Sequence, residues 1–373
     1  MERFFTIDTH SDTPTASFAK AGWDFAARHE YTGDRSQIDL PRLREGKMDA
    51  MVFAVYTAQF ARSPAGHAAA HDLALKHFER THAILRAHAA QCALALTADD
   101  GLRLKREGRC AIYLSIENAY PLGRDVANVA KFHALGVRML GLTHILNNEI
   151  ADSSTDPRGA EWKGLSPLGR EVVAECNRLG IVLDASHASD DALRGLLEHS
   201  TTPPILSHSD CRAVCDHPRN IDDDLLRALA ARGGVIQINA LPISLVHLPG
   251  TRRTSGAAEA LLKFKDAVLS PETMAAEDEE YARVGRENPN PRVVLDDFIR
   301  HIEHAVSVAG IDHVGIGCDL DGGGGTFEGL QEVKDFPNIT AALRARGWSE
   351  TDLAKLWGEN TLRVMRAAEA AAR

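Results

Sequence analysis

Several common sequence features are missing from this chain of 373 residues, and each absence narrows its class. No apolar run approaches the roughly 18 residues that span a membrane, so no membrane partner is expected. The N-terminus lacks the basic and long apolar regions of a signal peptide. The net charge is −10 and no basic stripe stands out in the sequence, which argues against a nucleic-acid partner.

Short cofactor and redox motifs are missing as well. No Gly-x-Gly-x-x-Gly turn follows the first predicted strand, which counts against a dinucleotide-binding sheet. The glycine run 322–325 is not followed by Lys-Ser/Thr, so no phosphate loop is expected there. Cys-x-x-Cys spacing does not occur, and we interpret the six cysteines as reduced thiols of a cytoplasmic protein: Cys92, Cys110, Cys176, Cys211, Cys215 and Cys318.

What the sequence does contain is an alternation of short apolar runs with longer amphipathic ones. Strand character is found at 4–9, 49–56, 111–116, 139–143, 182–185, 205–207, 235–239 and 314–318. Helical patterns lie between them, at 66–89, 126–135, 167–179, 192–198, 222–231 and 292–309. Eight strands separated by helices predict an α/β fold, a (β/α)8 TIM barrel, with an open doubly wound sheet as the structural alternative.

The domain organisation follows from the same pattern. We expect residues 1–373 to form a single barrel domain. The stretch 241–290 is rich in Pro, Ala and charge and separates the seventh strand from the next helix. It predicts an insertion, or lid, near the C-terminal mouth of the barrel. Residues 340–373 are expected to form C-terminal helices.

Polar residues stand at the C-terminal ends of six predicted strands, where a barrel places its catalytic groups. His10 and Asp12 follow the first strand, and their spacing of two puts them on one face. Any single histidine has an ordinary explanation in a chain with 17 of them, but the coincidence predicts a metal site. Five later strands end at further polar residues: Glu117, His144, His187, His208 and Asp319.

The ligand inventory suits two ions better than one. Three histidines and two carboxylates exceed the three protein ligands of one catalytic zinc. His10, Asp12 and Glu117 are expected to bind one ion, and Glu117, His187 and His208 the other. Glu117 is the candidate bridge because it lies between the two groups in chain order. The expected cofactors are two divalent ions, roughly 3.5–4 Å apart, that share a hydroxide nucleophile; this ligand set favours zinc but can also hold manganese or cobalt.

Other titratable residues have expected roles around these ligands. Asp319 is the candidate proton shuttle between water and the leaving group, and Asp321 is its rival by strand parity. His144 is expected to polarise the carbonyl under attack and to stabilise the oxyanion. Asp8 is expected to accept a hydrogen bond from the other nitrogen of a ligand histidine, with a buried structural acid as the alternative. Seven further histidines are interpreted as surface helix positions: His67, His71, His77, His82, His88, His301 and His304.

At these residues the chain resembles the membrane (renal) dipeptidase family, a branch of the amidohydrolase-type barrels. The resemblance implies a binuclear zinc dipeptidase that cleaves small dipeptides, L-Xaa-D-Xaa included, with a metal-bridging hydroxide. It also implies that His144 contacts the scissile carbonyl and that Arg219 binds the substrate's C-terminal carboxylate, a task that suits an arginine fork. The matching segments are 8–12, 116–118, 142–144 with Asn147 and 151–153, 184–187, 207–209 with 219–220, and 315–322.

The chain departs from the family pattern in two places. It has neither the secretion and lipid-anchor signals nor the disulfide cysteines of the mammalian members, so it looks like a soluble bacterial member, and a homodimer is left open. Asn118 and Ala119 stand where glycines are expected after the glutamate.

Two other functions stay open at this point. One is another binuclear amidohydrolase-type hydrolase, such as a lactonase, phosphotriesterase or deaminase. Such enzymes often bridge their metals with a carboxylated lysine on strand four, whereas that strand ends here in Thr143 and His144. The other is a catalytically silent binding protein, against which the full ligand set with Asp319 argues.

Overall fold

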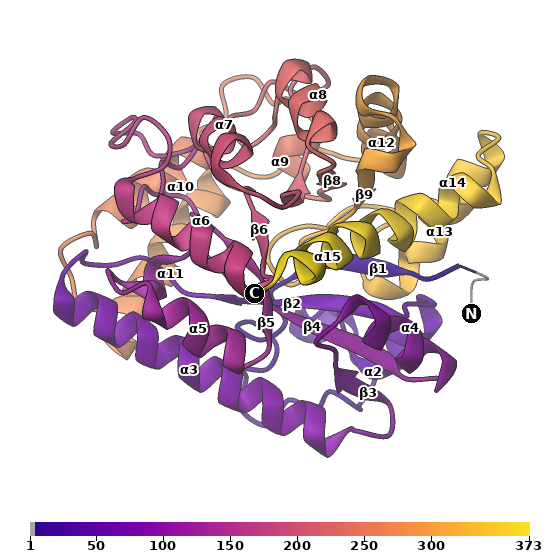
Figure 1. Ribbon diagram of the computed structural model, residues 1–373, viewed down its shortest axis with the longest axis horizontal. Helices are drawn as coiled ribbons and strands as arrows, with labels where there is room; N and C mark the ends of the chain where they lie inside the picture. Colours follow the sequence, from indigo (N-terminus) through magenta and orange to yellow (C-terminus); the bar gives the residue numbers. More distant parts are fainter. Residues whose placement is uncertain (1–3) are drawn as a thin grey trace.

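The computed structural model describes residues 4–373, and its centre is a sheet of parallel strands surrounded by helices (Figure 1). Ser11 forms a parallel bridge with Leu320, and the Asp12 N–H donates to the Leu320 carbonyl at 3.0 Å, which joins the first strand to the segment after the last. The predicted α/β barrel is therefore confirmed. Its strands follow chain order: β1 (Ile7–Ser11), β2 (Ala50–Tyr56), β4 (Cys110–Glu117), β5 (Val137–Gly141), β6 (Val182–Asp184), β7 (Ile205–Ser209), β8 (Val235–Ile238) and β9 (Val314–Ile316).

One additional strand was not predicted. β3 (Cys92–Leu94) pairs with the N-terminal part of β4, where Cys92 lies opposite Cys110. The C-terminal part of β4 pairs instead with β5, so the two short neighbours occupy successive stretches of β4. Three residues are too few for an alternating hydrophobic pattern to appear in the sequence.

Helices cover the outside of the barrel, and most begin where a polar side chain caps the free backbone N–H groups. Ser63, Thr97 and Ser166 each accept a hydrogen bond from the backbone N–H three residues further on. Helix α6 begins and ends as predicted, because Ser166 caps its start, Pro167 is its first residue and Gly180 follows it. The covering helices are α3 (Pro64–Ala87), α4 (Ala98–Arg106), α5 (Ala127–Ala134), α6 (Pro167–Leu179), α7 (Asp190–His199), α8 (Asp223–Ala231) and α12 (Leu295–Ala309).

The N-terminal end of the barrel is closed by the last helix, α15 (Asn360–Ala371), which lies across the strands in Figure 1. One apolar cluster joins the first inward-facing residues of the strands to this helix: Ile7, Ala50, Ala111, Val182, Ile205 and Val235 with Leu362, Val364, Met365 and Ala368. Helices α13 (Phe336–Ala345) and α14 (Glu350–Ala354) precede α15. The opposite, C-terminal end of the strands is thus left for the polar residues.

The connection from β8 to α12 holds three helices: α9 (Pro242–Leu245), α10 (Arg253–Leu262) and α11 (Pro271–Glu287). They follow the C-terminal end of β8, and Figure 1 draws α10 and α11 behind α5 and α6, on the side away from α15. Two short helices, α1 (Tyr31–Asp34) and α2 (Leu40–Glu45), lie in the connection from β1 to β2. Within residues 4–373, no helix is both long and apolar enough to cross a bilayer.

Three helix histidines are buried, so their interpretation as surface residues was wrong: His67, His77 and His301. His301 on α12 is the clearest case. Its Nδ1 accepts a hydrogen bond from the Cys211 N–H, and its Nε2 donates to the Leu245 carbonyl, both at 3.1 Å. A neutral imidazole whose two nitrogens are satisfied by backbone groups can lie inside a core, and this pairing with distant backbone has no local sequence signal.

We expect acidification to destabilise the fold through His301. Burial lowers the pKa of this histidine to about 4, from 6.5. Between pH 4 and pH 6.5 the unfolded chain binds more protons than the folded one. The contribution of His301 to the free energy of unfolding is therefore complete above pH 6.5 and is lost as the pH falls towards 4. The effect amounts to about 3 kcal/mol. Urea-unfolding midpoints between pH 7 and 4.5 should fall less steeply in His301→Gln, whose amide can accept and donate in place of the ring; equal slopes would contradict this.

Candidate metal centre

All seven polar residues predicted at strand ends converge at the C-terminal mouth of the barrel. They form three overlapping groups, and within each group the ligand atoms lie within 4.8 Å of one another. The groups are His10, Glu117 and His208; Glu117, His144 and His187; and His10, Asp12 and Asp319. All are buried except His144, which is partly exposed. The structure thus brings all seven residues together, although the three groups divide them differently from the two expected sets.

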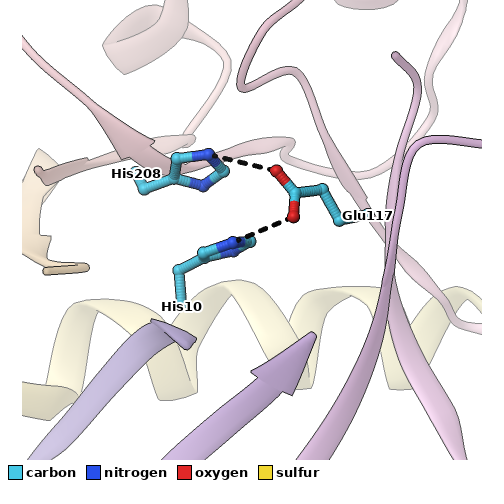
Figure 2. A group of neighbouring side chains, drawn as sticks. All are labelled: His10, Glu117 and His208. Atoms are coloured by element: carbon cyan, nitrogen blue, oxygen red, sulfur yellow. Dashed lines mark ion pairs between the residues drawn. The ribbon is translucent and has the colours of Figure 1, made fainter. Parts of the chain in front are cut away.

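Glu117 lies at the centre of the cluster, and its two carboxylate oxygens face different histidines (Figure 2). Oε2 lies 3.4 Å from His10 Nε2. Oε1 lies 3.0 Å from His187 Nε2 and 3.7 Å from His208 Nε2. In Figure 2 the His10 and His208 rings point towards the carboxylate from opposite sides. A carboxylate in this position can serve two ions at once, one through each oxygen.

The donor atoms of the cluster fit divalent cations. His10 Nε2 and His187 Nδ1 are buried and have no hydrogen-bond partner within residues 4–373. The Nε2 atoms of His187 and His208 face each other at 2.9 Å. Burial lowers the pKa of His187 and of His208 well below the usual value, which leaves both as neutral imidazoles, the form that binds metals.

His10 shows that the carboxylates favour a positive charge at this point. Burial lowers the pKa of His10, but the Glu117 and Asp12 carboxylates raise it by more, and the net pKa lies well above the usual value. Asp12 Oδ2 and Asp319 Oδ1 lie 3.6 and 4.0 Å from His10 Nε2. Three buried carboxylates around one ring nitrogen are the environment that a divalent cation would neutralise.

Several strand-end residues adopt the left-handed backbone conformation, which is uncommon outside glycine. His187 and Asp319 have φ angles of 68° and 60°, and Asn118 has 68°. Such conformations cost energy and cluster at functional sites. Asn118 stands where a glycine was expected from the resemblance, and asparagine is among the residue types that best tolerate this region. Its side chain also donates to the Thr57 carbonyl at 3.2 Å, which holds the turn.

Because Gly322 has no side chain, there is room beside it for the carboxylates of Asp12 and Asp319. A Cβ atom at this position would lie 2.1 Å from Asp12 Oδ2 and 2.2 Å from Asp319 Oδ1, far inside contact distance. A larger residue would therefore displace one or both carboxylates. The role of this glycine could not be predicted from the sequence, because it depends partly on Asp12, 310 positions away.

Asp8 does not orient a histidine ring, and the expectation that it does was wrong. Its carboxylate accepts hydrogen bonds from the backbone N–H groups of His10 at 3.0 Å and Cys318 at 2.8 Å. Burial raises its pKa to about 6. Asp8 thus links the backbone at His10 to the backbone just before Asp319, and so holds the first and last barrel strands together.

Asp184 and Ser207 orient the ring of His208, a role that the sequence analysis did not assign. Ser207 Oγ donates to Asp184 Oδ2 at 2.5 Å and lies 2.8 Å from His208 Nδ1. Because the hydroxyl proton goes to Asp184, the serine oxygen can accept the Nδ1–H of His208. His208 Nε2 is then unprotonated and turned towards the cluster. Both residues lie in quoted motif segments, but nothing local distinguishes them as a relay.

Asp321, the rival of Asp319, has its carboxylate engaged elsewhere. It accepts hydrogen bonds from Thr13 Oγ1 at 2.8 Å, Ser17 Oγ at 3.1 Å and the Gln37 N–H at 2.7 Å. These bonds hold the segment after β1 against the mouth of the barrel. Asp319 lies within the cluster instead, where burial raises its pKa well above the usual value, and the neighbouring Asp12 and Glu117 carboxylates raise it further.

Arg219 lies next to the cluster, and His144 is the cluster's one partly exposed member. Arg219 is 8% exposed, and its Nη2 donates to the His208 carbonyl at 3.2 Å. Its Nη1 is buried without a hydrogen-bond partner in the part of the chain that the structure describes. The His144 ring packs against those of Tyr56 and His187, with centroids 4.6 and 4.3 Å away. Burial, reinforced by Arg219, lowers the pKa of His144 to about 3, so its ring is neutral.

An α/β barrel with histidines and carboxylates gathered at its C-terminal mouth defines the class of metal-dependent barrel hydrolases. Within that class the chain belongs to the membrane dipeptidase family, peptidase family M19, whose model matches residues 1–373. The family predicted from the motifs is therefore confirmed, and the protein is a peptide-bond hydrolase of a metallopeptidase family.

Individual relatives agree with this assignment. Dipeptidase tcpJ of Claviceps purpurea is 31% identical over 369 residues, which cover 97% of this chain and 76% of that protein. Dipeptidase verJ of Clonostachys rogersoniana is 30% identical and covers 97% and 84%. Among solved structures, the probable dipeptidase PvdM from Pseudomonas aeruginosa aligns with a TM-score of 0.84 at 29% identity, covering 99% of this chain and 96% of that one.

Proposed function

We propose that this protein is a zinc-dependent dipeptidase with a binuclear metal centre. The proposal rests above all on Glu117, whose two oxygens face His10 on one side and His187 and His208 on the other. His10, Asp12 and Glu117 would hold one ion, and Glu117, His187 and His208 the other. Imidazole nitrogens and carboxylate oxygens are ligands that zinc accepts readily.

The metal ions and the surrounding residues divide the chemistry between them. Bound divalent ions supply the Lewis acidity that makes water a nucleophile at neutral pH. Asp319 takes a proton from the attacking water and gives it to the amine nitrogen as the C–N bond breaks. The neutral His144 ring donates a hydrogen bond to the carbonyl oxygen and stabilises the negative charge that develops there.

Arg219 would select substrates by their free carboxylate. Its unpartnered Nη1 and its burial favour binding of an anion, because a carboxylate would satisfy a buried donor and compensate its charge. The substrates proposed are therefore dipeptides with a free C-terminus, with either an L or a D residue at that end. Other hydrolases that use a similar metal pair, such as lactonases, are disfavoured by the dipeptidase relatives and by the segment after β5, where Thr143 and His144 stand instead of a lysine.

A reducing location, the cytoplasm, is part of the proposal. All six cysteines are buried free thiols, which is typical of proteins that fold where disulfides do not form. Labelling of thiols in intact cells before and after reduction would test this, and extensive oxidation in the cell would contradict it.

The test of the proposed activity is hydrolysis by the zinc form. Protein stripped with a chelator and reloaded with Zn²⁺ should cleave members of a dipeptide library that pairs L,L with L,D stereoisomers. Lactones, phosphotriesters and nucleobases serve as the competing substrates. Cleavage of any of these competitors in preference to all dipeptides, or cleavage of nothing by protein with two ions bound, would overturn the proposal.

We expect His208→Ala to lose one of two bound zinc ions, because His208 is one of the three residues proposed to hold the second ion, together with Glu117 and His187. Metal per protein, measured by atomic emission after dialysis, should fall from two equivalents to about one, and activity should fall with it. His304→Ala is the matched control, since His304 pairs with Asp223 on the surface helices and should keep both ions. Two retained equivalents in His208→Ala would contradict the ligand assignment.

A further inference from the structure

A cavity of about 380 Å³ lies among the loops that follow β5, β7 and β8. Three segments line it: the loop after β5 with Ser154 and Thr155, the loop after β7 with Asp216 and His217, and the α9–α10 segment with Thr254. Its volume lies within the range of pockets that bind small molecules and far above the roughly 30 Å³ of one water. The cavity can therefore accept a whole amino-acid side chain.

Two walls of the cavity are built on residues that flank the catalytic cluster. The Ser154 N–H donates to the His187 carbonyl at 2.8 Å, and Ser153 Oγ donates to the His144 carbonyl at 2.6 Å. On the other wall, the Arg219 N–H donates to His217 Nδ1 at 3.2 Å. The cavity thus begins next to the residue proposed to bind the substrate's carboxylate.

The inserted helices supply the third wall. Thr254 at the start of α10 forms a 2.7 Å hydrogen bond with His217 Nε2, which ties the insertion to the loop after β7. Burial lowers the pKa of His217 to about 4, so this histidine adds no charge near neutral pH. The insertion thereby becomes part of the substrate pocket.

The polar groups of the lining favour a cation over an anion. Asp156 is neutralised by Arg158 at 2.6 Å, whereas the exposed Asp216 forms no ion pair within residues 4–373. Ser154 Oγ is buried and has no hydrogen-bond partner in the same part of the chain. The lining contains no lysine or arginine among the described residues. A bound acidic side chain would therefore find no lysine or arginine in the lining, while a basic one would find Asp216.

We propose that this cavity binds the side chain of the substrate's C-terminal residue and prefers a basic side chain to an acidic one. The inference rests on the proposed dipeptidase function. The carboxylate and the side chain of that residue branch from one Cα, each about 1.5 Å from it, so their binding sites must adjoin. Arg219 and the His217 wall adjoin in this way.

The test compares Ala-Lys, Ala-Gln, Ala-Glu and Ala-Gly as substrates of the zinc enzyme. Wild-type kcat/KM should be about tenfold higher for Ala-Lys than for Ala-Glu, which corresponds to about 1.4 kcal/mol. Asp216→Asn should reduce this ratio to about two and leave Ala-Gly unchanged. Asp266→Asn, an exposed acid elsewhere in the insertion, should keep the wild-type ratio. Ser255→Trp, which fills the cavity from its α10 side, should slow Ala-Lys and Ala-Gln at least tenfold and spare Ala-Gly.

A binding measurement separates the cavity from the chemistry. Calorimetric titration of the metal-free protein with the free amino acids should give tighter binding of lysine than of glutamate, and Asp216→Asn should remove the difference. If dipeptides are cleaved but neither the ratio nor the binding depends on Asp216 or Ser255, the cavity assignment fails alone. If no dipeptide is cleaved, the proposed function fails and takes this inference with it.

Discussion

Asp319→Asn should reduce kcat about 10³-fold while both metal ions remain bound. Asparagine keeps the shape of aspartate but cannot take up a proton, and proton transfer by a positioned side chain contributes 10²–10⁴-fold. Asp319 lies within the cluster, with Oδ1 4.0 Å from His10 Nε2. Burial raises the pKa of Asp319, which suits a group that must both accept and release a proton. Steady-state kinetics and metal analysis on the same samples measure the two quantities.

Asp321→Asn provides the matched control, because Asp321 stands two residues away and bonds to Thr13, Ser17 and Gln37. Its loss should lower the unfolding temperature and leave kcat within a few-fold of the wild type. Turnover of Asp319→Asn within tenfold of the wild type would remove Asp319 from the role of proton shuttle. Loss of a metal equivalent in Asp319→Asn would make it a ligand of His10's ion instead.

The barrel could be predicted because its signals are local. Each of its eight strands is a short apolar run, and most of the helices between them are capped by serine, threonine or aspartate; these signals need no tertiary contact. β3 could not be predicted, since its three residues form a strand only by pairing with β4. His301 was misassigned for the same reason, as its partners Cys211 and Leu245 lie 90 and 56 residues away.

The positions of the candidate ligands were predictable from one rule of the fold. Parallel strands of a barrel end at the same mouth, so His10 and His208 had to approach each other although they are far apart in the chain. The supporting residues follow no such rule. The relay from Asp184 through Ser207 to His208, and the space at Gly322, depend on side-chain distances that sequence spacing does not contain.

Substitution of Arg219 should abolish the preference for a free C-terminus. Arg219→Gln is expected to lower kcat/KM for Ala-Ala about 10³-fold, because hydrogen bonds between charged groups contribute about 1.5–3 kcal/mol each and an arginine can make two. The amide Ala-Ala-NH2 has no carboxylate to lose, so its slow hydrolysis should change little. The ratio of the two kcat/KM values therefore isolates recognition of the carboxylate from the chemical step.

Arg212→Gln is the matched control, since Arg212 lies on the same loop but its guanidinium is paired with Asp190 at 2.7 Å. It should keep the wild-type ratio. Added guanidinium should partly restore Ala-Ala hydrolysis in Arg219→Gln and have no effect on the amide. If Arg219 acted only by holding the His208 carbonyl, to which its Nη2 donates, then acid and amide would slow equally and a metal equivalent would be lost. The carboxylate-binding role of Arg219 is therefore decided by the difference between Ala-Ala and Ala-Ala-NH2, which differ only in the C-terminal group.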